Sequence, residues 1–406
     1  MTEEDLAPVV APQKHLVLLL AAFTSLVVLT TDVYLPVLPQ LGEDLGTTNA
    51  AAAATVSAVL IGIAVGQIVI GPLSDAVGRR RPLLLGAVAF AVTHLLSAMA
   101  PNVGVLIAFR VLAGLATAAC IVVARAIIAD VYPGAASARA FATLGAVMAI
   151  APVVAPVAGG LLAQVMSWRG MFVILAVLAL ALVAVGWRSL PETLPPDRRI
   201  PPHLGAVLRD LAGVLALRRF LAYVVVMMAV GGLLFGYIGA SAFVLQDSFG
   251  LSPTAYSLVF ALNSIGIFVM SWVTRHIVGR TGPRRLLVVG QISGIVGVAL
   301  FGVGVAFSSL PLVVMGLFVA IASLGLVMPS ATALGMAEAP GRAGSASGVM
   351  GISQFTVGAL ASPLAGLGGS PWSLVVVMAV SAVAGLVVRV LLLLGTADTT
   401  HDRSTA

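Results

Sequence analysis

Charged residues and cysteine are both scarce in this sequence. Only 9% of the 406 residues are charged and 60% are hydrophobic, whereas soluble proteins carry about a quarter charged residues. This composition excludes a soluble globular protein and predicts a polytopic membrane protein. Cys120 is the only cysteine, which excludes an internal disulfide and a thiolate metal cluster. The five histidines are scattered without ligand spacing, so we predict no metal site.

Long apolar runs are abundant. A run of about 20 apolar residues is long enough to cross a bilayer as a helix. We predict twelve such spans, at residues 16–38, 51–73, 82–100, 103–128, 140–163, 169–189, 219–246, 253–278, 285–307, 309–336, 343–367 and 371–395. The expected fold class is therefore an all-α membrane protein with twelve transmembrane helices.

The basic residues mark one side of the membrane. Nearly all arginines fall in loops that share a side with the N-terminus, and Arg169 is the only basic residue in the opposite loops. Because cytoplasmic loops carry the excess of basic residues, both termini are predicted to be cytoplasmic. Topology thus accounts for the net charge of +6, and no nucleic-acid partner is expected. The preference for arginine over lysine hints at a GC-rich bacterial gene, so we expect a bacterial cytoplasmic membrane.

A charged, proline-rich segment divides the chain into two halves. The first apolar run lacks a signal cleavage site and is too long for a signal peptide, so the residues before it are predicted to be a tail. The predicted domains are a cytoplasmic tail at 1–15, an N-terminal six-helix bundle at 16–189, a cytoplasmic linker at 190–218, a C-terminal six-helix bundle at 219–395 and a second tail at 396–406.

The two halves echo one another in sequence. The segment around Pro156 resembles that around Pro363, and Gly78 with its arginines resembles Gly282 with its arginines, at nearly the same offset. Such matches suggest a duplicated six-helix unit, as in many secondary transporters. Chance similarity in a sequence rich in Ala, Gly and Val is the alternative.

Two charged residues lie deep inside predicted spans, Asp32 in the first and Arg110 in the fourth. A charge in hydrocarbon is costly, so each is a functional candidate. The rise of an α-helix places both at similar depth, and we hypothesise one polar network that couples proton binding to substrate binding. Alternatively, Asp32 faces the outer water at a helix end and Arg110 only anchors packing.

The loop between the second and third spans has an unusual combination of residues. Gly71 and Gly78 permit a sharp reversal of the chain, and Asp75 can pair with Arg79 four residues later. A loop that only set the topology would need only the arginines, Arg79 and Arg80 among them. The added glycines and aspartate therefore indicate a specific function.

The fifth span contains two prolines and a glycine pair. Pro152 and Pro156 each free a backbone carbonyl and bend the helix, and Gly159 and Gly160 allow a close helix crossing. A kinked, tightly packed span can seal the outer side against leak. Plain packing is the alternative interpretation.

A group of aromatic and amide side chains inside or at the ends of spans has the composition of a small-molecule site. The candidates are Tyr34, Phe235, Tyr237, Phe243, Gln246, Asn263, Gln354 and Phe355. For each of them, packing or lipid contact is the alternative role.

These segments resemble the major facilitator superfamily. Gly71 to Arg80 is similar to motif A, Arg110 with Gly114 to motif B, and Ala151 to Gly160 to the antiporter motif C. More narrowly, five segments resemble the Bcr/CflA (bicyclomycin and chloramphenicol resistance) branch of drug:H⁺ antiporters. They are Asp32 to Pro39, Gly71 to Asp75, Pro191 to Pro196, Phe260 to Asn263 and Arg342 to Ser347.

The resemblance implies two pseudo-symmetric six-helix bundles and proton-driven drug export by alternating access. It assigns proton coupling to Asp32 and Arg110 and gating to the motif A residues, with the proton gradient as energy source and no cofactor. The expected partners are a small amphipathic drug, protons and the lipid bilayer, and the protein is expected to be a monomer. Four positions depart from the family pattern without removing an ionisable group, namely Val33, Ala76, Ala155 and Ala242.

Other functions fit the sequence less well. A symporter or exporter of an endogenous metabolite would share the fold, although motif C argues against import. An enzyme would need a nucleophile with its base or a metal constellation, and none is visible, so no enzymatic activity is predicted. A sensor or scaffold would not require Asp32.

Overall fold

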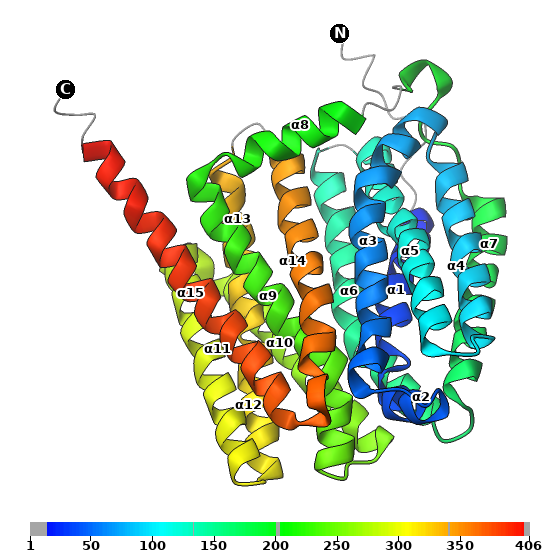
Figure 1. The fold of residues 1–406 in the computed structure, drawn as a ribbon. Helices are drawn as coiled ribbons and strands as arrows, with labels where there is room; N and C mark the ends of the chain where they lie inside the picture. Colours follow the sequence, from blue (N-terminus) through cyan, green and yellow to red (C-terminus); the bar gives the residue numbers. More distant parts are fainter. Residues whose placement is uncertain (1–13, 133, 200–203, 340–341, 402–406) are drawn as a thin grey trace. The chain divides into compact units, whose positions relative to one another are not determined.

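The computed structural model describes residues 14–132, 134–199, 204–339 and 342–401. Contacts between Cα atoms divide the chain into two compact units (Figure 1). The first unit contains the chain up to Tyr34 and Ala58–Leu204, and the second contains Leu35–Ser57 and the chain from Gly205 onward. The sequence-based domains, by contrast, place Leu35–Ser57 in the N-terminal bundle.

The first unit is built from long helices. Its elements are α1 (Lys14–Asp32), most of α3 (Asn49–Val77), α4 (Arg80–Ala98), α5 (Val103–Val131), α6 (Gly134–Leu162), α7 (Trp168–Ser189) and the short 3₁₀ turn η3 (Pro196–Arg198). Helix α4 packs against α5 and α7, and α1 packs against α5, α6 and α7. These contacts bring α1, α4 and α5 together around the buried polar residues described below.

The second unit has the same kind of helical packing. Its elements are η2 (Leu35–Val37), α2 (Leu38–Asp44), α8 (Leu204–Leu215), α9 (Arg218–Phe243), η4 (Val244–Ser248), α10 (Pro253–Thr281), α11 (Pro283–Ala306), α12 (Leu310–Ala322), α13 (Leu324–Ala337), α14 (Ala343–Ala365), η5 (Leu367–Gly369) and α15 (Pro371–His401). Helices α14 and α15 both pack along α9 (Figure 1), and α11 packs against α12 and α13. The segment η2 also contacts α9 and α10, which explains why it groups with this unit.

The first predicted span does not continue as one helix. Helix α1 stops at Asp32, and the chain turns through η2 before α2 begins. Pro36 lies within η2, and a proline disfavours helical backbone at the residue before it and cannot donate a backbone hydrogen bond. The predicted first span at 16–38 therefore lies within the candidate span His15–Asp44 but contains a break, and Asp32 is the last residue of α1.

The predicted number of spans is confirmed. Twelve helices of the described residues are long and apolar enough to cross a membrane, and those residues contain no β-strand. The tenth span, Leu310–Ala337, is divided into α12 and α13 at Ser323, whose hydroxyl donates to the Ala320 carbonyl at 2.7 Å. Such side-chain to backbone bonding within a helix favours a bend.

Glycines allow two helices of the first unit to cross closely. A Cβ at Gly114 of α5 would overlap the Val59 carbonyl oxygen of α3 and lie 3.0 Å from the Gly62 Cα. Gly62 in turn faces the backbone of α5, where a Cβ would overlap the Val111 carbonyl oxygen. The two helices therefore touch backbone to backbone, which small residues permit in membrane proteins.

This crossing predicts a large difference between two glycine substitutions. Gly114→Ala is expected to destabilise the protein by about 1–3 kcal/mol, because the added methyl group meets rigid backbone. Gly145→Ala in α6 is the matched control, since a Cβ there meets no atom within 4 Å. The apparent melting temperature of each purified variant in detergent measures the effect. Equal melting temperatures would contradict the close crossing.

Candidate functional site

The broken end of α1 buries a carboxyl group. The Asp32 side chain is only 4% exposed, and its Oδ1 accepts a hydrogen bond of 2.7 Å from the Thr31 hydroxyl. Within the described part of the chain, the ion pairs involve other residues and none joins Asp32 to a basic side chain. Asp32 is thus an acid held out of water by packing and by one hydroxyl, without a neutralising partner.

Arg110 of α5 is fully buried beside the same helix end. Its guanidinium donates to the Thr30 hydroxyl at 3.0 Å and also to the Thr30 carbonyl. The His94 Nε2 lies 3.5 Å from the Arg110 Nη1. The guanidinium carbon stands 4.7 Å from the Tyr34 ring centroid and 5.2 Å from that of Phe172. Two aromatic faces and a bidentate contact to Thr30 therefore hold this cation in place.

Among the described residues, Asp32 and Arg110 belong to two separate hydrogen-bonded groups at the end of α1. Arg110 binds Thr30, while Asp32 is bonded through Thr31. The two charged side chains contact consecutive residues of α1, Thr30 and Thr31, but they do not form an ion pair with each other. The alternative of an acid facing outer water does not match the burial of Asp32, although its position at a helix end does. His94 was not among the predicted site residues. The signal that could have found it was an imidazole inside an apolar span.

The motif A arginine joins three acceptors at one end of the first unit. Arg79 donates to Asp75 Oδ1 at 2.5 Å, to Asp130 Oδ2 at 2.9 Å and to the Ser74 hydroxyl at 2.7 Å. The predicted pairing of Asp75 with Arg79 is therefore confirmed. Burial by itself would lower the pKa of Arg79, but Asp130 and Asp75 hold that pKa above its ordinary value, so the guanidinium stays charged.

Glu192 fastens this loop to the segment that follows α7. Its carboxylate accepts from the backbone nitrogens of Arg79 at 2.8 Å and Arg80 at 3.3 Å. Gly78, with φ of +97°, leaves the space, since a Cβ there would lie 2.6 Å from Glu192 Oε2. The Thr193 hydroxyl also donates to Asp130 at 3.2 Å. Glu192 and Asp130 complete the cluster, and neither was predicted as a site residue.

The other two motif A residues, Gly71 and Arg80, have different positions: Gly71 lies inside a helix, and Arg80 begins the next one. The prediction of a reversal at Gly71 is wrong, because α3 continues as a helix to Val77. The Arg80 guanidinium donates to the Trp187 carbonyl at 2.5 Å and lies over the Trp187 ring at 5.4 Å. The turn is therefore made by Gly78 alone, and Arg80 ties α4 to the end of α7.

The motif C helix contacts the Asp32 segment. Pro152 and Pro156 both lie inside α6, as predicted from the sequence. A Cβ at Gly159 would overlap the Val33 carbonyl oxygen, and Gly160 is the buried neighbour. Gly159 therefore lets α6 pack directly on the residue after Asp32, which connects motif C to the buried acid.

The predicted substrate residues fall into separate groups. Tyr34 lies against Arg110 in the first unit. In the second unit, Asn263 donates to the Tyr237 hydroxyl at 2.8 Å, and the Phe235 and Phe355 ring centroids are 5.6 Å apart. These contacts form two distinct clusters on α9 rather than a single one.

The remaining candidates have structural partners. The Gln246 amide donates to the Pro36 carbonyl at 3.0 Å, which holds η2 against the end of α9. Gln354 and Phe243 are both buried, and the Gln354 backbone packs so closely on Gly231 that a Cβ there would overlap its carbonyl oxygen.

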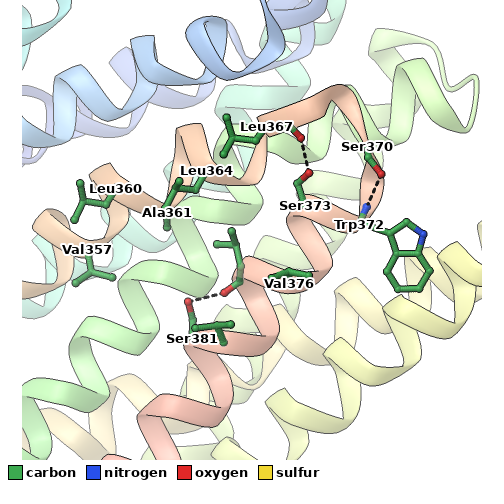
Figure 2. A pocket seen from close by; sticks show the side chains of 12 residues that line it. Val357, Leu360, Ala361, Leu364, Leu367, Ser370, Trp372, Ser373, Val376 and Ser381 are labelled. Atoms are coloured by element: carbon green, nitrogen blue, oxygen red, sulfur yellow. Dashed lines mark hydrogen bonds between the residues drawn. The ribbon is translucent and has the colours of Figure 1, made fainter.

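A cavity in the second unit contains none of these predicted residues. It has a volume of about 650 Å³ and lies between α14 and α15. Figure 2 shows its apolar lining, with Leu360 and Leu364 on α14 and Val376 on α15, and the indole of Trp372 near the loop that joins them. Several of its leucine and valine side chains are exposed, and they belong to helices that are long and apolar enough to cross a membrane.

Twelve candidate spans, with charged residues buried among them and a charged cluster at one turn, define a multi-pass membrane protein. Comparison with known proteins agrees, because residues 18–363 match the family model of the Major Facilitator Superfamily. The chain belongs to this superfamily, and it is a transporter and not an enzyme.

Relatives and solved structures extend the comparison. The chain is 33% identical to the uncharacterized MFS-type transporter YdgK of Bacillus subtilis (strain 168), over 87% of this chain and 88% of that protein. It is 30% identical to a chloramphenicol resistance protein of Pseudomonas aeruginosa, over 71% and 68%. A bacterial homologue of the human lysosomal transporter Spinster, crystallised inward-facing and occupied, shares the fold with a TM-score of 0.76 at 17% identity, over 94% and 96%.

Proposed function

We propose that this transporter is a proton-coupled antiporter that exports small amphipathic drugs, of the chloramphenicol or bicyclomycin kind, from the cytoplasm by alternating access. The observation that carries this proposal is Asp32, a buried carboxyl at a broken helix end whose one hydrogen-bond partner among the described residues is the Thr31 hydroxyl. An acid without a fixed cation can exist in both protonation states, which is what a coupling site requires. Arg110 donates to Thr30 in the last turn of α1 and so places a positive charge near the same helix end.

Proton exchange at Asp32 can drive export through linkage. If drug binding favours the ionised carboxyl, each binding event releases a proton, and each proton binding event in turn releases the drug. The membrane potential contributes about 2.3 kcal/mol per charge per 100 mV, so the proton gradient is an adequate energy source without a cofactor.

The two motif regions support the change of access. The Arg79 cluster ties the α3–α4 turn to Asp130 and Glu192, and its breaking and reforming is suited to gating at the arginine-rich side. Motif C packs on Val33 through Gly159, so movement of α6 and exposure of the Asp32 segment are mechanically linked. The excess of arginine on one side supports cytoplasmic termini, and we place the monomeric protein in the bacterial cytoplasmic membrane.

The proposed substrate preference rests on the candidate residues of each unit taken separately. In the first unit the Tyr34 ring lies against Arg110. In the second unit the aromatic residues of α9 and α14 offer flat apolar surface, and Asn263 offers a buried amide whose Oδ1 has no partner among the described residues. One deep acid gives little reason to expect strongly dicationic compounds. We therefore propose neutral or zwitterionic amphipathic antibiotics as substrates.

Purified protein in proteoliposomes tests this proposal. Chloramphenicol added to vesicles under an imposed pH gradient is expected to cause a proton flux that saturates with drug concentration and disappears with an ionophore. Protein-free vesicles and vesicles with a heat-inactivated sample are the controls. If a panel of neutral amphipathic antibiotics gives no proton flux, the drug assignment is wrong. Exchange of protons for a metabolite under the same conditions would then identify an endogenous substrate.

A further inference from the structure

His94 is a buried imidazole to which the proposed function gives no role. It lies on α4, is fully buried, and its ring stacks on Phe90 with centroids 3.9 Å apart and planes at 19°. The Phe172 ring meets it edge-on at 5.9 Å. A polar ring kept among aromatic neighbours needs partners for its nitrogens, and both nitrogens of His94 have one.

The partners fix which nitrogen carries the hydrogen. His94 Nδ1 lies 2.8 Å from the Phe90 carbonyl oxygen, which only accepts, so Nδ1 donates there. The neutral ring then presents a lone pair at Nε2, which lies 2.9 Å from the Thr30 hydroxyl. Arg110 already donates to the oxygen of that hydroxyl. The single hydrogen of Thr30 is therefore free to be donated to His94.

The result is a directed chain of hydrogen bonds across three helices. It runs from Arg110 on α5 to Thr30 on α1, from Thr30 to His94 on α4, and from His94 to the Phe90 carbonyl. Each polar group donates to the next, so all the hydrogen bonds point in the same direction. A proton on Nε2 would reverse the contact with Thr30 and place a second cation 3.5 Å from Arg110.

We propose that His94 is a positioning residue for proton coupling, and this inference rests on the proposed function of Asp32. As a neutral acceptor it orients the Thr30 hydroxyl so that its oxygen faces Arg110. It thereby holds the guanidinium and the last turn of α1, two residues before Asp32, in one arrangement. His94 acts through Thr30 and Arg110, without contact to the transported proton or drug.

The charged and titratable groups around the ring come from each neighbouring element. Helix α5 contributes Arg110, whose guanidinium also lies against the Tyr34 ring. Helix α1 contributes the uncharged Thr30 hydroxyl, and its acid Asp32 follows two residues later in the chain. Helix α7 presents the uncharged Phe172 ring, and its Arg169 donates to the Ala100 carbonyl near the far end of α4. Arg110 is therefore the charge that His94 can influence directly.

Two substitutions separate the acceptor from the aromatic ring. His94→Phe keeps a ring of similar size against Phe90 but removes the acceptor for Thr30. His94→Gln places an amide oxygen near the position of Nε2 and restores the acceptor. Thr93→Val is the matched control, because in the described part of the chain that hydroxyl donates only to the Ala89 and Phe90 carbonyls of its own helix.

The test measures protons released when chloramphenicol is added to purified protein in detergent, as a function of pH. We expect His94→Phe to shift the midpoint of this profile by roughly 0.5–1 pH unit, the size of one hydrogen bond expressed as a pH shift. His94→Gln is expected to return the midpoint most of the way to the wild-type value. Thr93→Val is expected to leave the midpoint unchanged. A purely structural role of His94 would lower the folded yield without moving the midpoint.

A second variant keeps the inference testable if His94→Phe folds poorly. Thr30→Val removes the hydroxyl that joins His94 to Arg110 and is expected to produce the same shift. The double variant, His94→Phe with Thr30→Val, is expected to show the shift of either single variant and not their sum. Both substitutions remove the same connection between His94 and Arg110. Additive shifts, or wild-type profiles in both single variants, would overturn the role of His94. Absence of drug-linked proton release in the wild type would instead overturn the proposed function.

Discussion

Asp32→Asn is expected to abolish the coupling between drug export and proton movement. Asparagine has nearly the same shape and can still accept a hydrogen bond from Thr31, but it cannot exchange a proton. Coupling free energies between sites are typically 1–3 kcal/mol, so the loss should reduce proton-driven drug accumulation by roughly 5- to 150-fold. The measurements are chloramphenicol accumulation in inverted vesicles and drug-linked proton release from purified protein.

The control for this prediction is an acid outside the membrane region. Asp197→Asn removes an exposed carboxylate in η3 and is expected to leave both measurements unchanged. Downhill movement of the drug without a proton gradient should survive in Asp32→Asn, because the binding surfaces remain. If Asp32→Asn still accumulates a neutral drug against its gradient, Asp32 is not the obligatory coupling residue.

Arg79→Ala is expected to have the second large effect, on both stability and transport. The change removes every donor that binds Asp75, Asp130 and Ser74 together. Asp130, whose side chain is 21% exposed, then keeps only the Thr193 hydroxyl among the partners described above. Hydrogen bonds to charged groups are each worth about 1.5–3 kcal/mol, and leaving a half-buried carboxylate unpaired adds to that loss. We expect an apparent melting temperature several degrees lower and little remaining transport.

The neighbouring arginine separates this effect from simple loss of charge. Arg81→Ala also removes one positive charge close to this turn, but Arg81, in the first turn of α4, is exposed. It is expected to change the melting temperature and transport little. Arg79→Lys keeps the charge but lacks the planar fork that reaches several acceptors at once, so an intermediate effect is expected. If Arg79→Ala and Arg81→Ala change the melting temperature and transport equally, the Arg79 cluster has no gating role.

Interactions between residues close in sequence were predictable. The spacing of Asp75 and Arg79 in the sequence predicts their pairing, and the pair forms across the turn at Gly78 that follows the end of α3. The other partners of Arg79 were not predictable in this way, because Asp130 belongs to α5 and Glu192 to the segment after α7. Their contacts form where the C-terminal ends of α3 and α5 meet the N-terminal end of α4. A local sequence pattern does not describe how the ends of separate helices meet.

The course of α1 illustrates a second limit. Hydropathy continues smoothly to residue 38 and gives no sign of a break at Asp32. Pro36 and the packing of η2 against α9 and α10 end the helix at Asp32 instead. An apolar window measures composition and is insensitive to a single proline. The position of Asp32 at a buried helix end therefore became visible only in the structure.

The sequence by itself predicted twelve membrane spans with Asp32 and Arg110 inside them, which is confirmed, and it predicts one arginine-rich side. These properties follow from hydropathy and charge, which are local. Only the tertiary structure decided that Arg110 binds Thr30 rather than Asp32, that His94 completes this contact, and that Gly159 packs on Val33. Such contacts depend on the rotation of each helix about its axis, and that rotation is set by packing among all neighbouring helices at once.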